Sequence, residues 1–457
     1  MADKVFIGSG AGFSGDRLDA GVAVIETLKN RDGPRYLIYE VMGERTLALA
    51  LTHKRRDPSL GYSPYLDRYL SRVLALAKEN NVCIVTNMGA ANPVGGAKRV
   101  HALAREMGIK GLKVAVVLGD DLLEIMSADD IRALPTIEGL ETGSQEVIAA
   151  NAYIGARPVA KALALGANIV LVGRTTDAAL VLGPLIHEFG WDEDDWQQLA
   201  AGTVAGHLLE CGGQVTGGYF CDPGFKDVPG MEILGFPIAE IEASGDFVIT
   251  KAENTGGLVS RATVIEQLLY EVHDPAAYLT PDVTLDIRNV ILEDDGKDRI
   301  RLRGAKGTPP PQTLKATIST DGGWCGEAEL TYAGPNALAR AKLAADIVRK
   351  RCAATGMNEP VRIEVLGTGA VFENDNGESV QPVISPQWGE YQLRAAVRSG
   401  SKDVAQYVAD EVLSLFCSGP AGGGGYRCQV ADQISTSSVL VERTDIDAQC
   451  RAELVTP

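Results

Sequence analysis

The chain has 457 residues, of which 45% are hydrophobic and 23% charged, so it can form two or three domains with substantial cores. Its formal net charge is −17. A surface this acidic repels nucleic acid and anionic lipid, so neither is expected as a partner. A small anionic substrate would need a local positive site.

The N-terminus MADKVFIG lacks the pattern of a signal peptide, and no apolar run approaches the roughly 18 residues of a membrane span. The eight cysteines are scattered, with no C-x-x-C and no zinc-finger spacing. These features predict a cytoplasmic protein with free thiols, no disulfide framework and no metal site.

A glycine-rich loop follows the first expected strand, in the run VFIGSGAGFSGDR. Gly10, Gly12 and Gly15 spell G-x-G-x-x-G, a helix-like stretch follows, and the next strand-like run, YLIYE, ends in Glu40. These are the parts of a dinucleotide-binding unit, whose loop amides hold a diphosphate. Asp16, directly after the third glycine, would repel that diphosphate, so NAD is less favoured than another anion. Asp16 itself is either a helix N-cap or a catalytic acid-base group.

The strand-like runs VCIVTN, KVAVVLGDD and ANIVLVGRTTD then alternate with helical stretches, which indicates parallel β-α-β units. In such a sheet the loops at the carboxyl ends of the strands form the ligand crevice. We therefore expect the loops at 10–15, 87–96 and 174–177 to gather around one crevice.

Amide and charged side chains occupy two of these loops. Asn87 and Asn92 would bind a carboxylate or carbonyl, or else cap the following helix and turn. Arg174 can form two parallel hydrogen bonds to a carboxylate or phosphate. Asp177 lies at the start of the next expected helix and is a candidate proton carrier. The alternative for these two is a structural Arg–Asp pair.

A helix of small residues is expected in TVAGHLLECGG. His207 and Glu210 lie three residues apart on one face of it, which suits an acid-base pair. A hydrogen-bonded core histidine is the alternative. Cys211 as a nucleophile is less favoured, and the spacing matches no metal signature.

From about residue 200 the pattern changes to strands broken by turn residues, which predicts antiparallel pairing. The fold class expected is α/β, with a Rossmann-like parallel sheet at the N-terminus followed by α+β regions with antiparallel strands. The expected divisions are a Rossmann-like region at 1–230, an α+β region at 231–355 that completes the first domain, and a C-terminal α+β segment at 356–457.

Two basic features stand out against the acidic background. SGPAGGGGYR is expected to be a loop that ends in Arg427 and captures an anion or covers a site, unless it is a surface turn. The cluster THKRRD at 52–57 is a solvated face, or, if it borders the crevice, a grip for the phosphates of coenzyme A.

Four long stretches resemble one known family: GSGAGFSGDRLDA, TNMGAANPVGGA, VLVGRTTDAALVLGPLIHEFGW and LAAGTVAGHLLECGGQVTGGYF. They are similar to the acyclic terpene utilisation protein family, and the likeness covers roughly residues 5–355. The resemblance implies catabolism of branched acyl compounds as coenzyme A thioesters, through lyase or hydratase steps. Some relatives carry an added ferredoxin-like domain or work with a small companion subunit. The last hundred residues lack the signature associated with that domain, so a companion chain is an option.

The leading hypothesis is a lyase or hydro-lyase acting on a carboxylate or acyl-CoA. Asp16, Asp177, His207 and Glu210 are its candidate proton carriers. The candidate donors to substrate are Gly10, Gly12, Gly15, Asn87, Asn92, Arg174 and Arg427. The alternatives are an NAD(P)-dependent oxidoreductase that uses the glycine loop and Glu40, and a non-catalytic subunit that needs a companion chain. A homo-oligomer is expected in each case.

Overall fold

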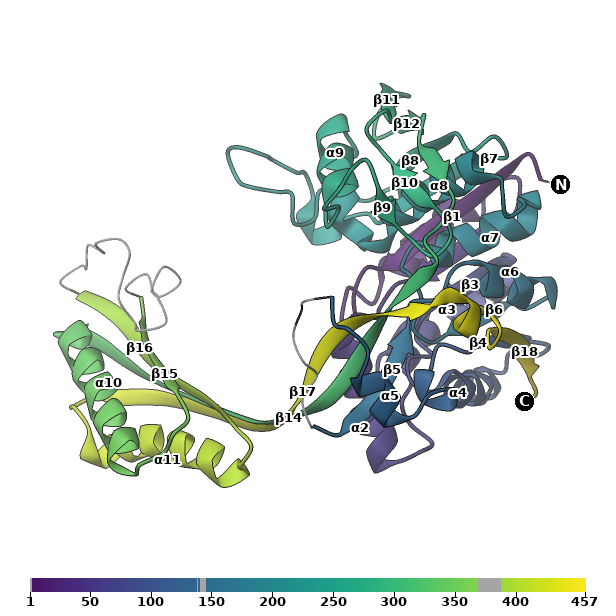
Figure 1. Ribbon diagram of the computed structural model, residues 1–457. Helices are drawn as coiled ribbons and strands as arrows, with labels where there is room; N and C mark the ends of the chain where they lie inside the picture. The colour runs from purple at the N-terminus through teal and green to yellow at the C-terminus, as the bar shows by residue number, and fades with distance from the viewer. Residues whose placement is uncertain (1, 138, 140–144, 368–387) are drawn as a thin grey trace. The chain divides into compact units, whose positions relative to one another are not determined.

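The computed structural model describes residues 2–137, 139, 145–367 and 388–457. The chain divides into two compact units (Figure 1). Unit 1 comprises Met1–Ser319 and Thr436–Pro457, and unit 2 comprises Thr320–Ser435. The ranges 1–230, 231–355 and 356–457 drawn from the sequence remain a prediction about how the chain divides.

Unit 1 is built on a sheet of ten strands whose parallel part runs in the order β1-β2-β3-β6-β4. These strands are almost wholly buried because helices cover both faces, which explains their continuous apolar runs. They are β1 (Lys4–Ala11), β2 (Arg35–Tyr39), β3 (Val82–Thr86), β6 (Ile169–Val172) and β4 (Val114–Leu118).

Antiparallel strands extend the same sheet at both edges, rather than forming a separate region. The full order is β11-β12-β8-β7-β1-β2-β3-β6-β4-β18. The fold is therefore α/β with one large mixed sheet, which confirms the coarse expectation. The added strands are β7 (Pro237–Glu242), β8 (Phe247–Lys251), β12 (Ile300–Arg303), β11 (Ile291–Asp294) and β18 (Arg451–Val455).

Alternate side chains of each strand enter two different cores. Phe6 and Leu37 pack with α1, α3 and α4, whereas Ile7 and Ile38 pack with α6, α7 and α8 on the other face. This alternation follows from the two-residue period of a strand. The helices are α1 (Ala20–Leu28), α2 (Glu44–Arg56), α3 (Leu66–Glu79), α4 (Pro93–Glu106), α5 (Ala128–Arg132), α6 (Arg157–Ala164), α7 (Ala179–Phe189), α8 (Trp196–Glu210), α9 (Arg261–Leu269) and α12 (Arg443–Asp447).

Short elements complete unit 1. A three-stranded sheet has the order β13-β10-β9, and the unpredicted strand β5 pairs with β14. The elements are η1 (Leu122–Glu124), β5 (Val147–Ala152), η2 (Gly212–Thr216), η3 (Met231–Ile233), β9 (Tyr278–Leu279), β10 (Thr284–Asp286) and β13 (Lys306–Thr308).

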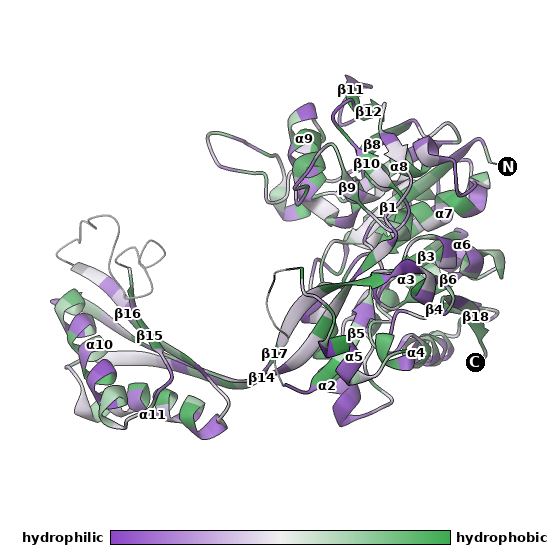
Figure 2. Ribbon diagram, viewed as in Figure 1, coloured by the Kyte–Doolittle hydropathy of each residue, from purple (hydrophilic) through white to green (hydrophobic). Residues whose placement is uncertain are grey.

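Unit 2 has the element order β-α-β-β-α-β and the strand order β15-β16-β14-β17, which is the ferredoxin-like arrangement. Hydrophobic and hydrophilic residues alternate around both helices (Figure 2), and their apolar faces pack on one sheet face around Leu330 and Leu393. The run expected to be a loop before Arg427 enters a strand at Gly423. The elements are β14 (Thr313–Pro335), α10 (Ala337–Ala354), β15 (Val361–Leu366), β16 (Trp388–Ser399), α11 (Lys402–Ser418) and β17 (Gly423–Glu442).

A buried carboxyl group ties three strands of unit 1 together. Oδ2 of Asp120, just after β4, accepts the backbone N–H of Arg174 after β6 at 2.8 Å and Nδ2 of Asn151 in β5 at 3.0 Å. Burial raises the pKa of Asp120 to about 6, against the lowering effect of these two hydrogen bonds. The carboxyl ends of β4, β5 and β6 are thus held in one place.

We expect the variant Asp120→Asn to gain stability relative to the wild type as the pH rises from about 4 to about 7. The pKa of Asp120 is about 6 in the folded chain against 3.8 in the unfolded chain. Its contribution is therefore fully present below the unfolded value and is lost as the pH rises through the folded value, by roughly 3 kcal/mol. Urea unfolding of both proteins across this range measures the difference. A difference that stays constant with pH would contradict the assignment.

Candidate functional site

A cavity of about 1130 Å³ in unit 1 lies where four strands end. Its walls include the segments that follow β1, β2, β5 and β6, together with the end of α8 and strand β9. Small-molecule sites occupy about 300–1,000 Å³ and favour the carboxyl ends of parallel strands. This cavity is the candidate site. Its ionisable lining residues are Asp16, Arg17, Glu40, Glu44, Arg45, Tyr153, Arg174, Asp177, Glu210, Cys211, Tyr219, Tyr270, Glu271, His273, Tyr278 and Lys315.

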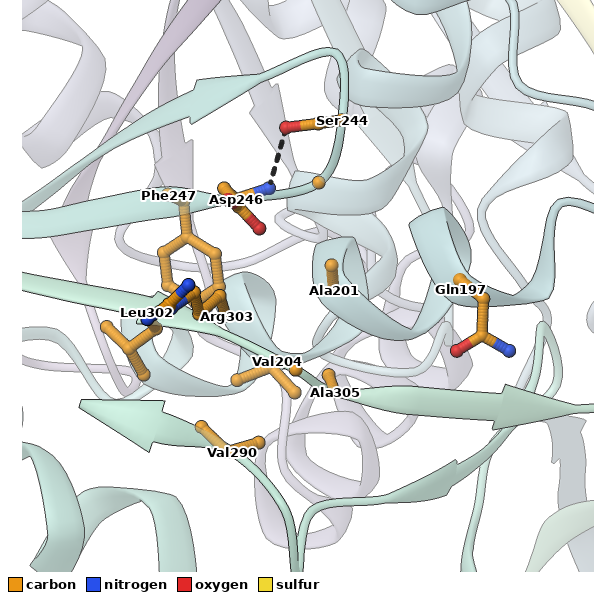
Figure 3. A pocket seen from close by; sticks show the side chains of 12 residues that line it. Gln197, Ala201, Val204, Ser244, Asp246, Phe247, Val290, Leu302, Arg303 and Ala305 are labelled. Carbon is orange, nitrogen blue, oxygen red and sulfur yellow. Dashed lines mark hydrogen bonds between the residues drawn. The ribbon is translucent and has the colours of Figure 1, made fainter.

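A second pocket, of about 190 Å³, lies beside α8 and the turn between β7 and β8 (Figure 3). Val204, Phe247 and Leu302 supply apolar walls, and the hydroxyl of Ser244 accepts the N–H of Asp246 at 3.3 Å. This pocket is much smaller, and its shape is set by packing around a turn. We assign it no ligand.

Arg174 is the buried cation of the cavity. Its guanidinium donates to the carbonyl oxygen of Met42 and lies 3.8 Å from the ring centre of Tyr153. Nη2 lies 3.7 Å from Oδ1 of Asp177, and Glu40 contributes a further negative charge nearby. The structural Arg–Asp pair considered for the sequence is thus present, and it lies within the candidate site.

Asp177 and Glu40 are neighbouring carboxyl groups whose pKa values are both raised. Burial and the neighbouring charge of Glu40 raise the pKa of Asp177 well above its usual range, more than Arg174 lowers it. Burial also raises the pKa of Glu40, which accepts hydrogen bonds from Asn87 Nδ2 at 2.7 Å and Met42 N at 2.9 Å. Oδ1 of Asp177 is buried without a hydrogen bond. The raised pKa favours the protonated form of Asp177, and within the described part of the chain its closest charged neighbour is Arg174.

Glu210 brings a second carboxyl group to the cavity, with His207 behind it. Nδ1 of His207 lies 2.8 Å from Oε1 of Glu210. Burial lowers the pKa of His207, but the charge and hydrogen bond of Glu210 and the charge of Glu271 outweigh it and raise the pKa. Burial raises the pKa of the Cys211 thiol far above its usual range, so a thiolate nucleophile is disfavoured there.

Several cavity residues have no counterpart in the sequence motifs, among them Glu44, Tyr153, Tyr278 and Lys315. The hydroxyl of Tyr153 donates to Glu44, and Lys315 lies 3.4 Å from the same carboxylate. Burial raises the pKa of Glu44, but these partners outweigh it and lower the pKa to about 2. Tyr278 lies 5.9 Å from His207, ring centre to ring centre. These residues follow β5 and β2 or lie in β14 and β9, and no residue pattern distinguishes them from ordinary core or surface positions.

The side chain of Asp16 folds back into the glycine loop. Its Oδ2 accepts Gly12 N at 2.9 Å and its Oδ1 accepts Arg17 N at 2.7 Å. Helix α1 begins only at Ala20, so Asp16 is not its N-cap. Burial raises the pKa of Asp16, against the lowering effect of both amides and Arg17. The carboxyl group thus occupies an amide that an anion would need.

The other residues that the sequence suggested for the site lie outside the lining of the cavity. Asn87 is buried, and its Nδ2 donates a hydrogen bond to Glu40. Asn92 caps α4, since its Oδ1 accepts a hydrogen bond from Gly95 N at 2.9 Å. Gly10 packs on the ring of Tyr39. The expected crevice therefore joins the first and third loops, together with the segment after β2, whereas the 87–96 loop supports it from outside the lining. Gly15 turns the glycine loop with a φ of 103°, and Arg427 is an exposed residue of unit 2.

No group of three or more histidine, cysteine, aspartate or glutamate side chains is placed to hold a metal ion within the described part of the chain. All eight cysteines are free. Among the same described residues, no helix is long and apolar enough to cross a membrane.

We expect Gly12→Ala to destabilise the protein by about 1–3 kcal/mol, because an added methyl group has no room. Its Cβ would lie 2.2 Å from the carbonyl carbon of Cys211 and 2.5 Å from Gly212 N. Urea unfolding measures the loss. Gly43→Ala is the matched control, since its Cβ would meet nothing within 4 Å. Equal losses in the two variants would show that the loop moves away from η2 without cost.

Comparison with known proteins covers nearly the whole chain. A family model described as "Acyclic terpene utilisation family protein AtuA" matches residues 5–452. The match extends past residue 355, where the likeness seen in the sequence ended, and includes the whole of unit 2, whose ferredoxin-like element order the last hundred residues did not indicate. A search of curated proteins gave no match. The chain belongs to the acyclic terpene utilisation AtuA family.

Proposed function

We propose that the protein catalyses a lyase or hydro-lyase step on a carboxylate or acyl-CoA substrate in the breakdown of branched or terpenoid acyl compounds. The observation that carries the proposal is the Asp177 carboxyl group, 3.7 Å from Arg174, in a cavity that Glu210 also lines with His207 bonded behind it; the pKa of Asp177 is raised well above its usual range. Two carboxyl groups in different environments can serve as the general acid and the general base of one reaction.

In the elimination direction, Glu210 is the base and Asp177 the acid. Glu210 takes the proton next to the substrate carbonyl, and His207 stabilises the carboxylate it bonds. Asp177 gives its proton to the departing hydroxyl group, which leaves as water while the carbon–carbon double bond forms. Arg174 then lies beside the new Asp177 carboxylate and compensates its charge. Water addition is the reverse.

The substrate anion would meet cations at the cavity wall rather than at the 52–57 cluster. Arg17, Arg45 and Lys315 are among the described lining residues. In the 52–57 cluster, Lys54 donates to the Ala91 carbonyl at 2.7 Å and Arg55 pairs with Glu146 at 2.6 Å. From the family resemblance we propose that coenzyme A is part of the substrate. From the free thiols we propose that the protein is located in the cytoplasm.

The oxidoreductase alternative has less support. Asp16 accepts a hydrogen bond from the Gly12 amide that a diphosphate would use. Glu40 is buried and accepts hydrogen bonds from Met42 N and Asn87 Nδ2, so it is not free to bind a ribose. Strand β1 has the antiparallel β7 beside it, where a dinucleotide-binding sheet continues with parallel strands. Because of this antiparallel neighbour, the sheet order does not establish a Rossmann-like N-terminal region, which is a proposal from the sequence. A subunit without catalytic activity would have no need for carboxyl groups with raised pKa values in a cavity of this size.

The test is to incubate the purified protein with hydroxyacyl-CoA, enoyl-CoA and hydroxy-acid panels in D₂O. Mass spectrometry would detect exchange of the proton next to the carbonyl and the gain or loss of water. Saturable binding of NADH, without exchange on any panel member, would favour the oxidoreductase instead.

We expect Asp177→Asn to lower turnover by roughly a hundredfold to ten-thousandfold, because an amide has the shape of the protonated acid but no proton to donate. The fold should be retained, since the amide has the size and shape of the carboxyl group it replaces, and thermal unfolding checks this. The assay is the exchange measurement above, with Asp192→Asn, an exposed carboxylate outside the cavity lining, as the control. Wild-type turnover in Asp177→Asn would remove Asp177 from the mechanism.

A further inference from the structure

The first turn of helix α2 forms part of the wall of the candidate-site cavity. Gly43, Glu44, Arg45 and Thr46 are among the described lining residues. Gly43 is the N-cap, and it has no side chain to accept the first-turn amides as Asn92 does in α4. A Cβ added at Gly43 would meet nothing within 4 Å, so the space in front of this turn is open. The first N–H groups of a helix and its dipole give such an end a partial positive charge.

The guanidinium of Arg174 lies beside this same turn. Its Nη1 donates to the carbonyl oxygen of Met42, the residue before the N-cap, and its Nη2 lies 3.7 Å from Asp177. The side chain is only 4% exposed, and within the described part of the chain its Nε is buried without a hydrogen-bond partner. A buried donor without a partner is costly, and native proteins satisfy nearly all of them. An acceptor group on a ligand in the cavity would satisfy this one.

Two further cations belong to this wall. Nζ of Lys315 lies 3.4 Å from Glu44 and 4.7 Å from the ring centre of Tyr153, the ring that also contacts Arg174. Arg45 is the second residue of α2 and lines the cavity beside Glu44. Glu44 offsets one of the three cations, so the wall keeps a net positive charge. This is the local positive site that an anionic ligand of an acidic protein requires.

The other acidic groups of the cavity do not cancel this charge. Glu40 and Asp177 lie near Arg174, but their raised pKa values favour the neutral forms. Asp16 accepts two amides within the glycine loop. Glu210 ends α8, and Glu271 follows α9, so both come from elements other than α2 and β14. The lining thus has a cationic wall at the start of α2 and an acidic one at the ends of α8 and α9.

We propose that the first turn of α2, together with Arg45, Arg174 and Lys315, is a carboxylate-binding subsite, the α2 subsite. A carboxylate has two oxygens that accept several charge-assisted hydrogen bonds at once, which suits a guanidinium, an ammonium and backbone amides in one place. Each nitrogen of Arg174 then has its own partner: Met42, Asp177 and the ligand. That the carboxylate belongs to the substrate rests on the proposed function, whereas the subsite itself does not.

Titration of the full chain with hexanoate, hexanamide and inorganic phosphate, followed by ligand-observed NMR, tests the proposal. Hexanoate and hexanamide share one tail, so the difference between their affinities measures recognition of the charge. We expect hexanoate to bind roughly tenfold or more tightly than either hexanamide or phosphate. Arg45→Gln and Lys315→Gln should each weaken hexanoate binding by roughly fivefold to tenfold and leave hexanamide unchanged. Both side chains are exposed enough for the fold to be retained, which thermal unfolding checks.

Glu44→Gln should act in the opposite direction and tighten hexanoate binding severalfold, because it removes the negative charge that offsets Lys315. Arg55→Gln is the matched control. Arg55 lies in the last turn of the same helix, outside the described lining, and the same charge is lost. Hexanoate binding should be unchanged in it.

Equal affinities for hexanoate and hexanamide would overturn the proposal, as would hexanoate binding that neither Arg45→Gln nor Lys315→Gln weakens. Tighter binding of phosphate than of hexanoate would overturn the assignment to a carboxylate. Because these titrations measure no turnover, they separate the subsite from the reaction. A protein that binds hexanoate as described but exchanges no proton in D₂O would contradict the proposed function alone.

Discussion

The buried guanidinium of Arg174 is the interaction on which the candidate site depends. Its backbone N–H is fixed by Asp120, its side chain reaches the segment after β2 through the carbonyl of Met42, and its plane lies against the ring of Tyr153. The segments that follow β2, β4, β5 and β6 thus all meet at Arg174, three through its side chain or its own place in the chain and one through its backbone N–H. Without it, Asp177 and Glu40 would have no positive charge beside them in the interior, which is the costly state for buried carboxyl groups.

The glycine loop illustrates how a familiar pattern can serve a different purpose. Its glycines let the backbone approach neighbouring groups: Gly10 meets the ring of Tyr39, and Gly12 meets the backbone at Cys211. Asp16 then closes the loop on itself by accepting two amides. The loop is a packed wall of the cavity, whereas the dinucleotide pattern requires amides that remain free for phosphate.

The parallel strands and the loops that end them could be predicted, because continuous apolar runs bounded by glycine and polar residues are local signals. Which loops line the cavity could not, since Asn87 and Asn92 are equally good ligands and caps until their neighbours are known. The joining of the antiparallel strands to the parallel sheet was also missed. Register across β1 and β7 depends on residues more than two hundred positions apart, and no local pattern records that pairing.

Strand β18 pairs with β4, so that Leu118 lies opposite Arg451. All of unit 2 must be synthesised between these two partners. At about 5–20 residues per second, the outer edge of β4 waits on the order of tens of seconds for its neighbour on the ribosome. An uncovered edge strand is a template for pairing with another chain. The period in which this protein is prone to aggregate is therefore set by the speed of translation as well as by the stability of the finished fold.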